Sequence, residues 1–310
     1  MAKLYKYVGP HYLDKVFSSE GHVTLKCSYP KDFNDPYELF LTMDFNQEPD
    51  AVAFYAEVVG KLPQIPTTCF SRSPIVLPMW AHYAQNLEGF VIEFDEDALA
   101  QAFPGSGFGD VDYQDAADED LSELLARAQH IGKYRYIWML HKAVFSAAYY
   151  TKATCWSYEQ ERRMVVRESE ARRFDNMILI DVPANCVNAI VCGPRASEKT
   201  ADAVSGIAEQ LGCSYFDLKI GKSSVVPFLV DSGGDPFVFD GARIVESEQS
   251  CGSCGEPVPP ESAECAWCQI TESHKSEAAA NNPYRMLDRA GLLEDYLAGM
   301  AEIDRKHRDE

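Results

Sequence analysis

Two Cys-x-x-Cys pairs near the C-terminus constrain this chain more than any other feature. Ten residues separate the pairs, which are Cys251/Cys254 and Cys265/Cys268. Four thiolates can hold Zn²⁺ tetrahedrally and leave no open coordination position, so the spacing predicts a structural zinc ion rather than a catalytic one. A redox dithiol pair is the alternative. A ribbon this small folds on its metal, so we expect it to form a unit of its own.

This ribbon divides the chain into three expected parts. They are a catalytic α+β domain at 1–245, the zinc ribbon at 249–271 and a C-terminal amphipathic helix at 281–306. Asn282-Pro283 places a capping residue before a proline at the first helical position. The apolar stripe of this helix packs on the rest of the chain or forms a contact with a protein partner or an oligomer; it consists of Leu293, Tyr296, Met300 and Ile303.

The composition excludes several classes of protein. The net charge is -20, and this does not favour a nucleic-acid partner, because neutralising phosphates requires an excess of Lys and Arg. The sequence contains no charged-then-apolar leader and no apolar run near twenty residues, so we expect no membrane span and no membrane partner. The six cysteines outside the ribbon lie in apolar surroundings and predict reduced thiols in a cytoplasmic protein.

The first 245 residues predict an α+β fold with a mixed, mainly antiparallel sheet core. Alternating or continuous apolar runs predict strands, among them 89–95, 177–182 and 187–192. A long helical segment is expected over 118–150, with a break at Gly132. No internal repeat is found.

The segment 156–166 carries the residue types best suited to catalysis. On a strand, Glu159, Glu161 and Arg163 lie on one face, because side chains alternate between faces. One carboxylate then bonds a sugar hydroxyl, and the other stabilises positive charge or accepts a proton. On a helix, by contrast, Glu159 and Arg163 form only an i,i+4 pair.

Two further segments supply candidate cofactor-binding residues. The Asn-Asp-Pro sequence is typical of a turn, which can present Asn34 or Asp35 to a pocket. The helical turn at 79–84 contributes Trp80, His82 and Tyr83. For His82 the alternative is a hydrogen-bonded packing residue.

The order of several short motifs resembles the bacterial domain-of-unknown-function 2971 family, roughly over residues 3–230. These motifs are Leu4-Tyr5-Lys6-Tyr7, Phe33-Asn34-Asp35-Pro36-Tyr37-Glu38, Cys69-Phe70-Ser71, Met79-Trp80-Ala81-His82-Tyr83, the strand at 89–95, Trp156 to Arg163, and Ile190-Val191-Cys192-Gly193-Pro194. The ribbon and the tail lie outside this resemblance.

Three of these segments also resemble the active-site strands of ADP-ribosyltransferases. The resemblance implies a split sheet and NAD as co-substrate, in a toxin or a phage-defence effector. Glu161 would stabilise the oxocarbenium ion formed as nicotinamide leaves, and Glu159 would orient or deprotonate the acceptor. The residues implied to bind NAD are Tyr5, Lys6 and Tyr7 on the first strand and Ser71 on the second. The first strand has no Arg or His, and Cys-Phe-Ser replaces the usual Ser-Thr-Ser.

Two other functions remain open from the sequence. The first is a metal-dependent nuclease or phosphoesterase, with hard-metal ligands drawn from Asp35, Glu38, Glu93, Asp95, Glu159 and Glu161. The second is a non-enzymatic module that senses a partner through the zinc ribbon and the terminal helix.

Overall fold

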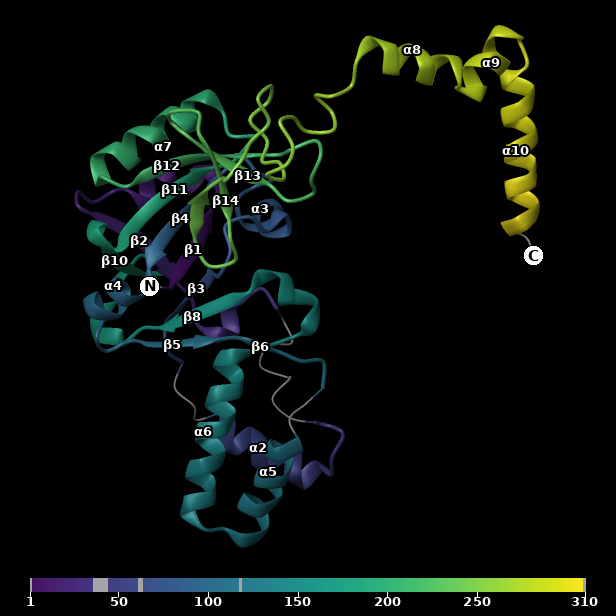
Figure 1. Cartoon of the computed structure of the whole chain (residues 1–310). Helices are drawn as coiled ribbons and strands as arrows, with labels where there is room; N and C mark the ends of the chain where they lie inside the picture. The colour runs from purple at the N-terminus through teal and green to yellow at the C-terminus, as the bar shows by residue number, and fades with distance from the viewer. Residues whose placement is uncertain (1, 36–43, 61–63, 117–118, 309–310) are drawn as a thin grey trace. The chain divides into compact units, whose positions relative to one another are not determined.

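The computed structural model describes residues 2–35, 44–60, 64–116 and 119–308 (Figure 1). The chain divides into two compact units, Met1–Ser247 and Glu248–Glu310. No helix in the described part of the chain is both long and apolar enough to cross a membrane.

A ten-stranded sheet forms the centre of the first unit. In spatial order its strands are β15 (Ile244–Glu246), β14 (Pro236–Phe239), β13 (Phe228–Asp231), β12 (Ser214–Lys219), β11 (Val187–Cys192), β4 (Phe90–Asp95), β1 (Lys3–Val8), β3 (Thr67–Ser71), β8 (Glu161–Val165) and β5 (Gly107–Asp110). Neighbouring strands are antiparallel except β11 and β12, which the helix α7 (Glu198–Leu211) connects. The predicted mixed, mainly antiparallel α+β fold is therefore confirmed.

Two small sheets accompany the large one. The first contains, in order, β2 (His22–Cys27), β10 (Met177–Pro183) and β9 (Arg172–Phe174). The second pairs β6 (Asp112–Tyr113) with β7 (Thr151–Lys152) in parallel. The two-residue β7 matters for the site because it fixes Lys152 directly after a long helix.

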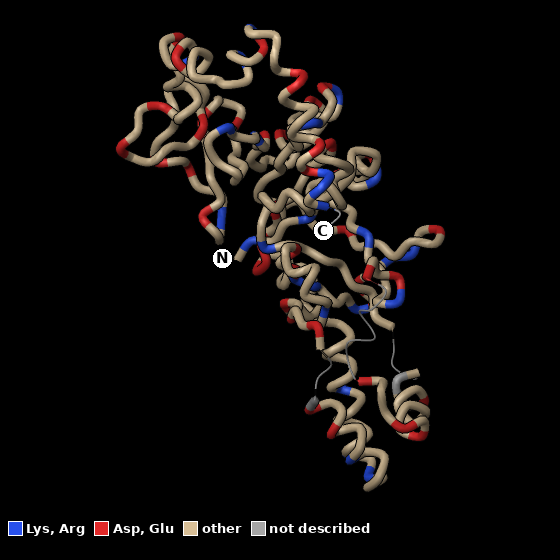
Figure 2. The backbone as a smooth tube through the Cα atoms, turned by 90° about the vertical axis from the view of Figure 1, so that its right-hand side faces the viewer, with Lys and Arg blue, Asp and Glu red and all other residues tan. Residues whose placement is uncertain are grey.

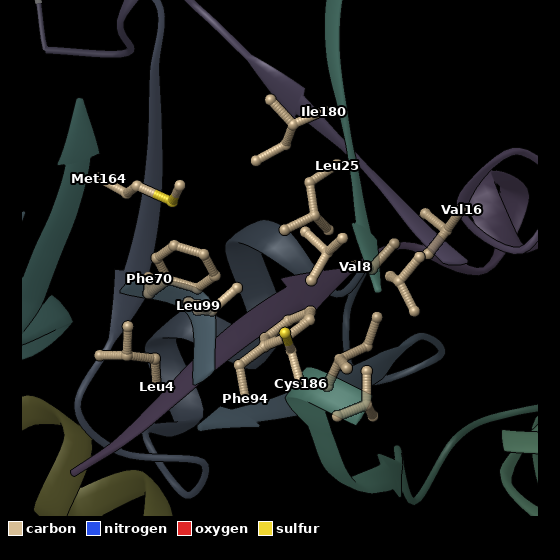
Figure 3. Packing of buried hydrophobic residues seen from close by; sticks show 14 of the residues in the cluster. Leu4, Val8, Val16, Leu25, Phe70, Phe94, Leu99, Met164, Ile180 and Cys186 are labelled. Atoms are coloured by element: carbon tan, nitrogen blue, oxygen red, sulfur yellow. The ribbon is translucent and has the colours of Figure 1, made fainter. Parts of the chain in front are cut away.

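Alternation along β1 places its side chains in two different cores. Leu4 and Val8 belong to a cluster that the three-stranded sheet closes with Leu25 and Ile180 (Figure 3). Tyr5 and Tyr7 point to the opposite face, where a second cluster includes Trp80 of α3 (Leu77–Tyr83). Burial on both faces explains why the central strands have continuous apolar runs instead of a simple alternation.

The helices of the first unit lie near the sheet or form a separate helical lobe. Those near the sheet are α1 (Leu13–Val16), α3 (Leu77–Tyr83), α4 (Glu96–Ala102) and α7, and those of the helical lobe are α2 (Pro49–Val59), α5 (Glu119–Ile131) and α6 (Tyr134–Tyr150). The predicted break at Gly132 is observed, with φ of 64°. Leu125, Leu140 and Val144 hold the lobe together in a third apolar cluster.

The large sheet is split between β1 and β3. These strands share a single register pair, Tyr5 with Ser71, whereas β1 and β4 share six. Beyond that pair, Lys6 spans the gap. Its Nζ donates to the Cys69 carbonyl at 2.7 Å and to the Thr68 Oγ1 at 3.2 Å. The strands therefore diverge around a lysine that satisfies some of the polar groups on the far side.

Gly193 is required because the chain passes very close to a neighbouring loop after β11. A Cβ at Gly193 would lie 2.2 Å from the Leu87 carbonyl oxygen, which is a backbone atom that cannot rotate away. Gly193→Ala is therefore expected to lower the free energy of unfolding by about 1–3 kcal/mol in chemical denaturation. Gly206→Ala is the control, since a Cβ there meets nothing within 4 Å inside α7. It should raise stability by about 0.5–1 kcal/mol, and equal losses in both variants would contradict this account.

The second unit contains the cysteine ribbon and three helices. The helices are α8 (Glu272–Ala280), α9 (Pro283–Arg289) and α10 (Leu293–Arg308). The Asn282 side chain caps α9 by accepting from the Tyr284 N–H at 3.0 Å, as its sequence indicates. The expected single helix at 281–306 is wrong, because Gly291 takes a φ of 70° and separates α9 from α10.

Candidate functional site

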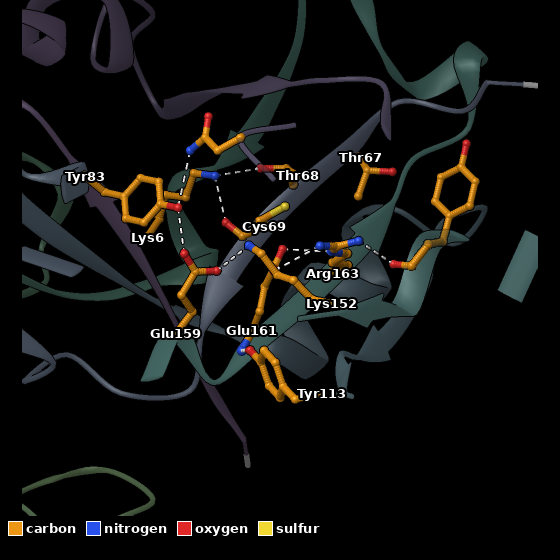
Figure 4. A network of polar contacts seen from close by, with 12 residues as sticks. Lys6, Thr67, Thr68, Cys69, Tyr83, Tyr113, Lys152, Glu159, Glu161 and Arg163 are labelled. Atoms are coloured by element: carbon orange, nitrogen blue, oxygen red, sulfur yellow. Dashed lines mark hydrogen bonds and ion pairs between the residues drawn. The ribbon is translucent and has the colours of Figure 1, made fainter. Parts of the chain in front are cut away.

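The two glutamates come from different elements, which corrects the predicted strand. Thr154–Glu159 forms a 3-10 helix, Gln160 adopts the left-handed conformation (φ 46°, ψ 51°), and β8 begins at Glu161. Glu161 and Arg163 share a strand face as predicted, but Glu159 does not belong to the strand. The helical alternative with a Glu159–Arg163 pair is also wrong. The left-handed residue turns the chain so that both carboxylates still meet (Figure 4).

Lys152 joins the two carboxylates. Its Nζ lies 2.6 Å from the Glu159 Oε2 and 3.2 Å from the Glu161 Oε2, and all three side chains are buried. The ammonium also lies 4.8 Å from the centre of the Trp156 ring. A buried lysine between two acids is compensated on both sides, which a buried charge requires.

Arg163 completes a group of two cations and two carboxylates. Its Nε and Nη2 donate to the two oxygens of Glu161 at 2.8 and 3.0 Å, and its Nη1 donates to the Tyr149 carbonyl at 2.9 Å. The guanidinium lies 4.8 Å from the centre of the Phe33 ring. This bidentate pairing fixes the orientation of the Glu161 carboxylate.

Glu159 is held on its other side by a tyrosine. The Tyr83 hydroxyl donates to the Glu159 Oε1 at 2.6 Å and accepts from the Asn34 amide at 3.3 Å. Tyr113 supports the adjacent strand, since its hydroxyl accepts from the Glu161 N–H at 2.8 Å. An ionised carboxylate offers about four acceptor sites, so Glu159 can still accept a ligand hydroxyl.

Burial and close charges shift the pKa values of this group. Burial alone would lower the pKa of Lys152, but Glu161 and Glu159 outweigh it and raise that pKa. Burial raises the pKa of Glu161, and Lys152 opposes this shift. Burial lowers the pKa of Arg163 to about 9, with the nearby Asp35 carboxylate opposing, so Arg163 stays charged at neutral pH. Burial, followed by the Glu159 charge, raises the pKa of Tyr83, which therefore remains a neutral donor.

These side chains line a cavity of about 810 Å³, within the range of small-molecule sites. Its wall comes from β1, β3 and β8, from Lys152 at the end of β7, and from Lys26 and Leu179 of the three-stranded sheet. The predicted residues that line it are Tyr5, Lys6, Tyr7, Asn34, Ser71, Tyr83, Glu159, Glu161 and Arg163. The cavity therefore lies where the sheet splits.

Some of the residues predicted to bind NAD make hydrogen bonds or packing contacts that stabilise the fold. Tyr7 donates to the Ser73 carbonyl at 2.9 Å, and the Ser71 Oγ accepts from the Ser73 N–H at 3.1 Å. Trp80 is buried in the second core and donates to the Pro74 carbonyl, and it does not line the cavity. His82 is exposed and also lies outside the lining. Asp35 is buried beside the cavity and acts on Arg163 through its charge.

Several central residues of the site carry no distinctive signal in the sequence. Lys152, Cys69, Thr68 and Phe33 all line the cavity but were not predicted. For Lys152 one signal existed: it is a lone cation seven residues before Glu159, between Tyr150 and Trp156. Cys69 and Phe33 belong to motifs named above, and Thr68 directly precedes one of these motifs.

The four ribbon cysteines form the one group in the described residues with the geometry of a metal site. Their sulfur atoms all lie within 4.8 Å of one another, and the Sγ atoms of Cys254 and Cys265 are 3.7 Å apart. Tetrahedral Zn–S bonds of about 2.3 Å place sulfurs at about this separation, so the donors fit a zinc ion. The acidic residues of the nuclease alternative form no such group among the described residues, and Glu38 lies outside them. Glu93 and Asp95 instead pair with Lys3.

Comparison with known proteins gives a match to one family model over part of the chain and no activity. Residues 79–164 match the model of a family described as Protein of unknown function (DUF2971), which confirms that resemblance over this segment. The segment contains Tyr83, Lys152, Glu159, Glu161 and Arg163 but neither β1 nor β3. No curated protein and no solved structure matches the chain. The resemblance to ADP-ribosyltransferases therefore has no support from these comparisons.

Proposed function

We propose that the cavity binds NAD and that the first unit cleaves its nicotinamide–ribose bond, as an ADP-ribosyltransferase or NAD glycohydrolase does. The observation that carries this proposal is the register across β1, β3 and β8. Tyr5 pairs with Ser71, and Ser71 pairs with Glu161, so the three segments expected to form the site are neighbours on one sheet face. A cavity bordered by that face is large enough for a dinucleotide.

In the proposed reaction, the two carboxylates of the site act on positive charge that develops on a sugar. As the bond between ribose C1′ and the nicotinamide nitrogen breaks, the electron pair leaves with nicotinamide and an oxocarbenium ion forms. Arg163 orients the Glu161 carboxylate, and the Lys152 ammonium binds both Glu161 and Glu159. Glu161 stabilises the cation electrostatically. Water or an acceptor then bonds C1′, and Glu159 takes the proton released.

Glu161→Gln is expected to reduce nicotinamide release from NAD by about 100- to 1,000-fold, because the amide keeps the shape but loses the negative charge. Release would be measured by chromatography on the purified, zinc-loaded chain. Glu93→Gln is the matched control, since it changes a buried glutamate on the sheet that does not line the cavity. Full activity in Glu161→Gln, or no NAD binding by the folded wild type, would refute the proposal.

Glu159→Gln separates transfer from hydrolysis. If Glu159 deprotonates the acceptor, this variant should still release nicotinamide but transfer less labelled ADP-ribose to protein or nucleic acid. Equal losses of release and transfer would instead place Glu159 in the cleavage step.

We also propose that the cysteine ribbon holds one structural zinc ion. Four thiolates leave no position for substrate or water, so the metal supplies stability rather than catalysis.

A further inference from the structure

One segment of this acidic chain contains no acidic residue. The chain has 48 Asp and Glu against 28 Lys and Arg, yet residues 124–158 include five Lys and Arg and neither Asp nor Glu. The segment runs from α5 through the turn at Gly132 into α6. The charge of the turn region is therefore opposite to that of the chain as a whole.

The same turn exposes large apolar side chains. Tyr134 is 93% exposed, Trp138 60%, Ile131 48% and Met139 46%. We call these four residues, together with Lys133 and Arg135, the hairpin tip. Aromatics that recur at helical spacing usually face a core, but Tyr134 and Trp138 face outward. Contiguous exposed apolar residues of this kind mark interaction surfaces.

The cations around the hairpin tip have no carboxylate partner among the residues that the structure describes. Lys133, Arg135 and Lys142 form no ion pair with a carboxylate in the described part of the chain; Arg135 contacts Tyr136 and Lys142 lies over Trp138. The nearest acid before the turn along α5, Glu123, is paired with Arg127. Glu123 precedes Ile131 by eight residues, about 12 Å of helix, which exceeds the Debye length of about 10 Å at 0.1 M salt.

From this combination we infer that the hairpin tip docks on an anionic phospholipid surface. Lys133 and Arg135 would meet lipid phosphates, while Trp138 and Tyr134 sit at headgroup depth with the aliphatic Ile131 and Met139 below. The hairpin projects away from the sheet, and Lys and Arg mark its lower end in Figure 2. Two aliphatic side chains beside few cations favour lipid over nucleic acid, which needs more phosphate contacts. The absence of a spanning helix does not bear on surface docking.

Vesicle co-sedimentation of the full, zinc-loaded chain tests this inference independently of NAD chemistry. The wild type should bind vesicles of mixed phosphatidylserine and phosphatidylcholine and bind phosphatidylcholine alone weakly. Lys133→Glu/Arg135→Glu should weaken binding at least about tenfold, since each basic residue near the surface contributes about 1 kcal/mol. Arg195→Glu/Lys199→Glu makes the same charge change on exposed residues elsewhere and should have little effect.

The apolar contribution has its own pair of variants. Tyr134→Ser/Trp138→Ser should also weaken binding, and the blue shift of tryptophan fluorescence on vesicles should disappear with Trp138. Val225→Ser, at a residue 93% exposed, is the control. The inference is overturned if wild type ignores anionic vesicles, if the tip variants bind as wild type does, or if the tip instead binds an oligonucleotide or a second copy of the chain.

Discussion

Replacing Lys152 with methionine is expected to lower the free energy of unfolding by about 3–5 kcal/mol, because it leaves two buried carboxylates facing each other. Glu159 and Glu161 lose the cation that lies 2.6 and 3.2 Å from them, and Arg163 compensates only Glu161. The loss would be measured by urea unfolding followed by fluorescence. Adding Glu159→Gln to Lys152→Met should recover part of it, because one of the two charges is removed.

Lys3→Met is the matched control for Lys152→Met. Lys3 also lies between two carboxylates, Glu93 and Asp95, but its side chain is 16% exposed against 6% for Lys152. Water can replace part of the lost interaction, so the expected loss is smaller. Equal losses of unfolding free energy in the two variants would contradict the view that burial makes the loss of Lys152 more costly than the loss of Lys3.

The stability of the Lys152→Met variant should also depend on pH differently from that of the wild type. Burial already raises the pKa of Glu161, and Lys152 holds it down, so removing Lys152 raises the folded-state pKa further. A carboxyl whose pKa is higher in the folded state contributes its full stability to the protein below its unfolded-state pKa of about 4.3. This contribution is lost as the pH rises through the folded-state pKa. The stability gap between wild type and Lys152→Met should therefore widen from acidic to neutral pH.

Removing zinc is expected to unfold the ribbon and leave the first unit intact. Structural zinc contributes about 10–16 kcal/mol of apparent binding free energy in small zinc modules, far more than such a module gains from its core. A chelator, or Cys265→Ser, should make residues 248–271 sensitive to protease while the main thermal transition stays unchanged. One zinc per wild-type chain would be measured by atomic absorption.

Cys155→Ser controls for the loss of a thiol outside the ribbon, since Cys155 is exposed and separate from the cluster. This variant should retain its zinc. Protease resistance that survives complete chelation would show that the ribbon does not depend on its metal.

The sheet could be predicted from the sequence because its signal is local. Strands such as β4 and β11 are buried on both faces, so their apolar runs are unambiguous. The break at Gly132 was also predicted, since glycine adopts positive φ at little cost. Gln160 shows the limit of this reasoning: a glutamine rarely takes the left-handed conformation, and here tertiary contacts hold it, including the Arg72 N–H that donates to its carbonyl at 2.9 Å.

The site was harder to predict because its members meet only through the fold. Glu161, Arg163 and Tyr83 belong to motifs that can be read from the sequence, and all three line the cavity, but Lys152 is joined to them by the short pairing of β6 with β7. Trp80 illustrates the opposite error, since its motif adjoins the cavity while its ring packs in the core. Which side of a short helix faces a pocket is not encoded by the residue type alone.

The split between β1 and β3 has a mechanical consequence. A sheet normally transmits force across every ladder bond, but here one register pair and the Lys6 side chain connect two halves that are each well paired internally. The seam is thus the weakest line across the sheet and forms one border of the cavity. A ligand that contacted β1 on one side and β8 on the other would connect the two halves of the sheet. Its binding free energy would then stabilise the sheet against local opening at the seam.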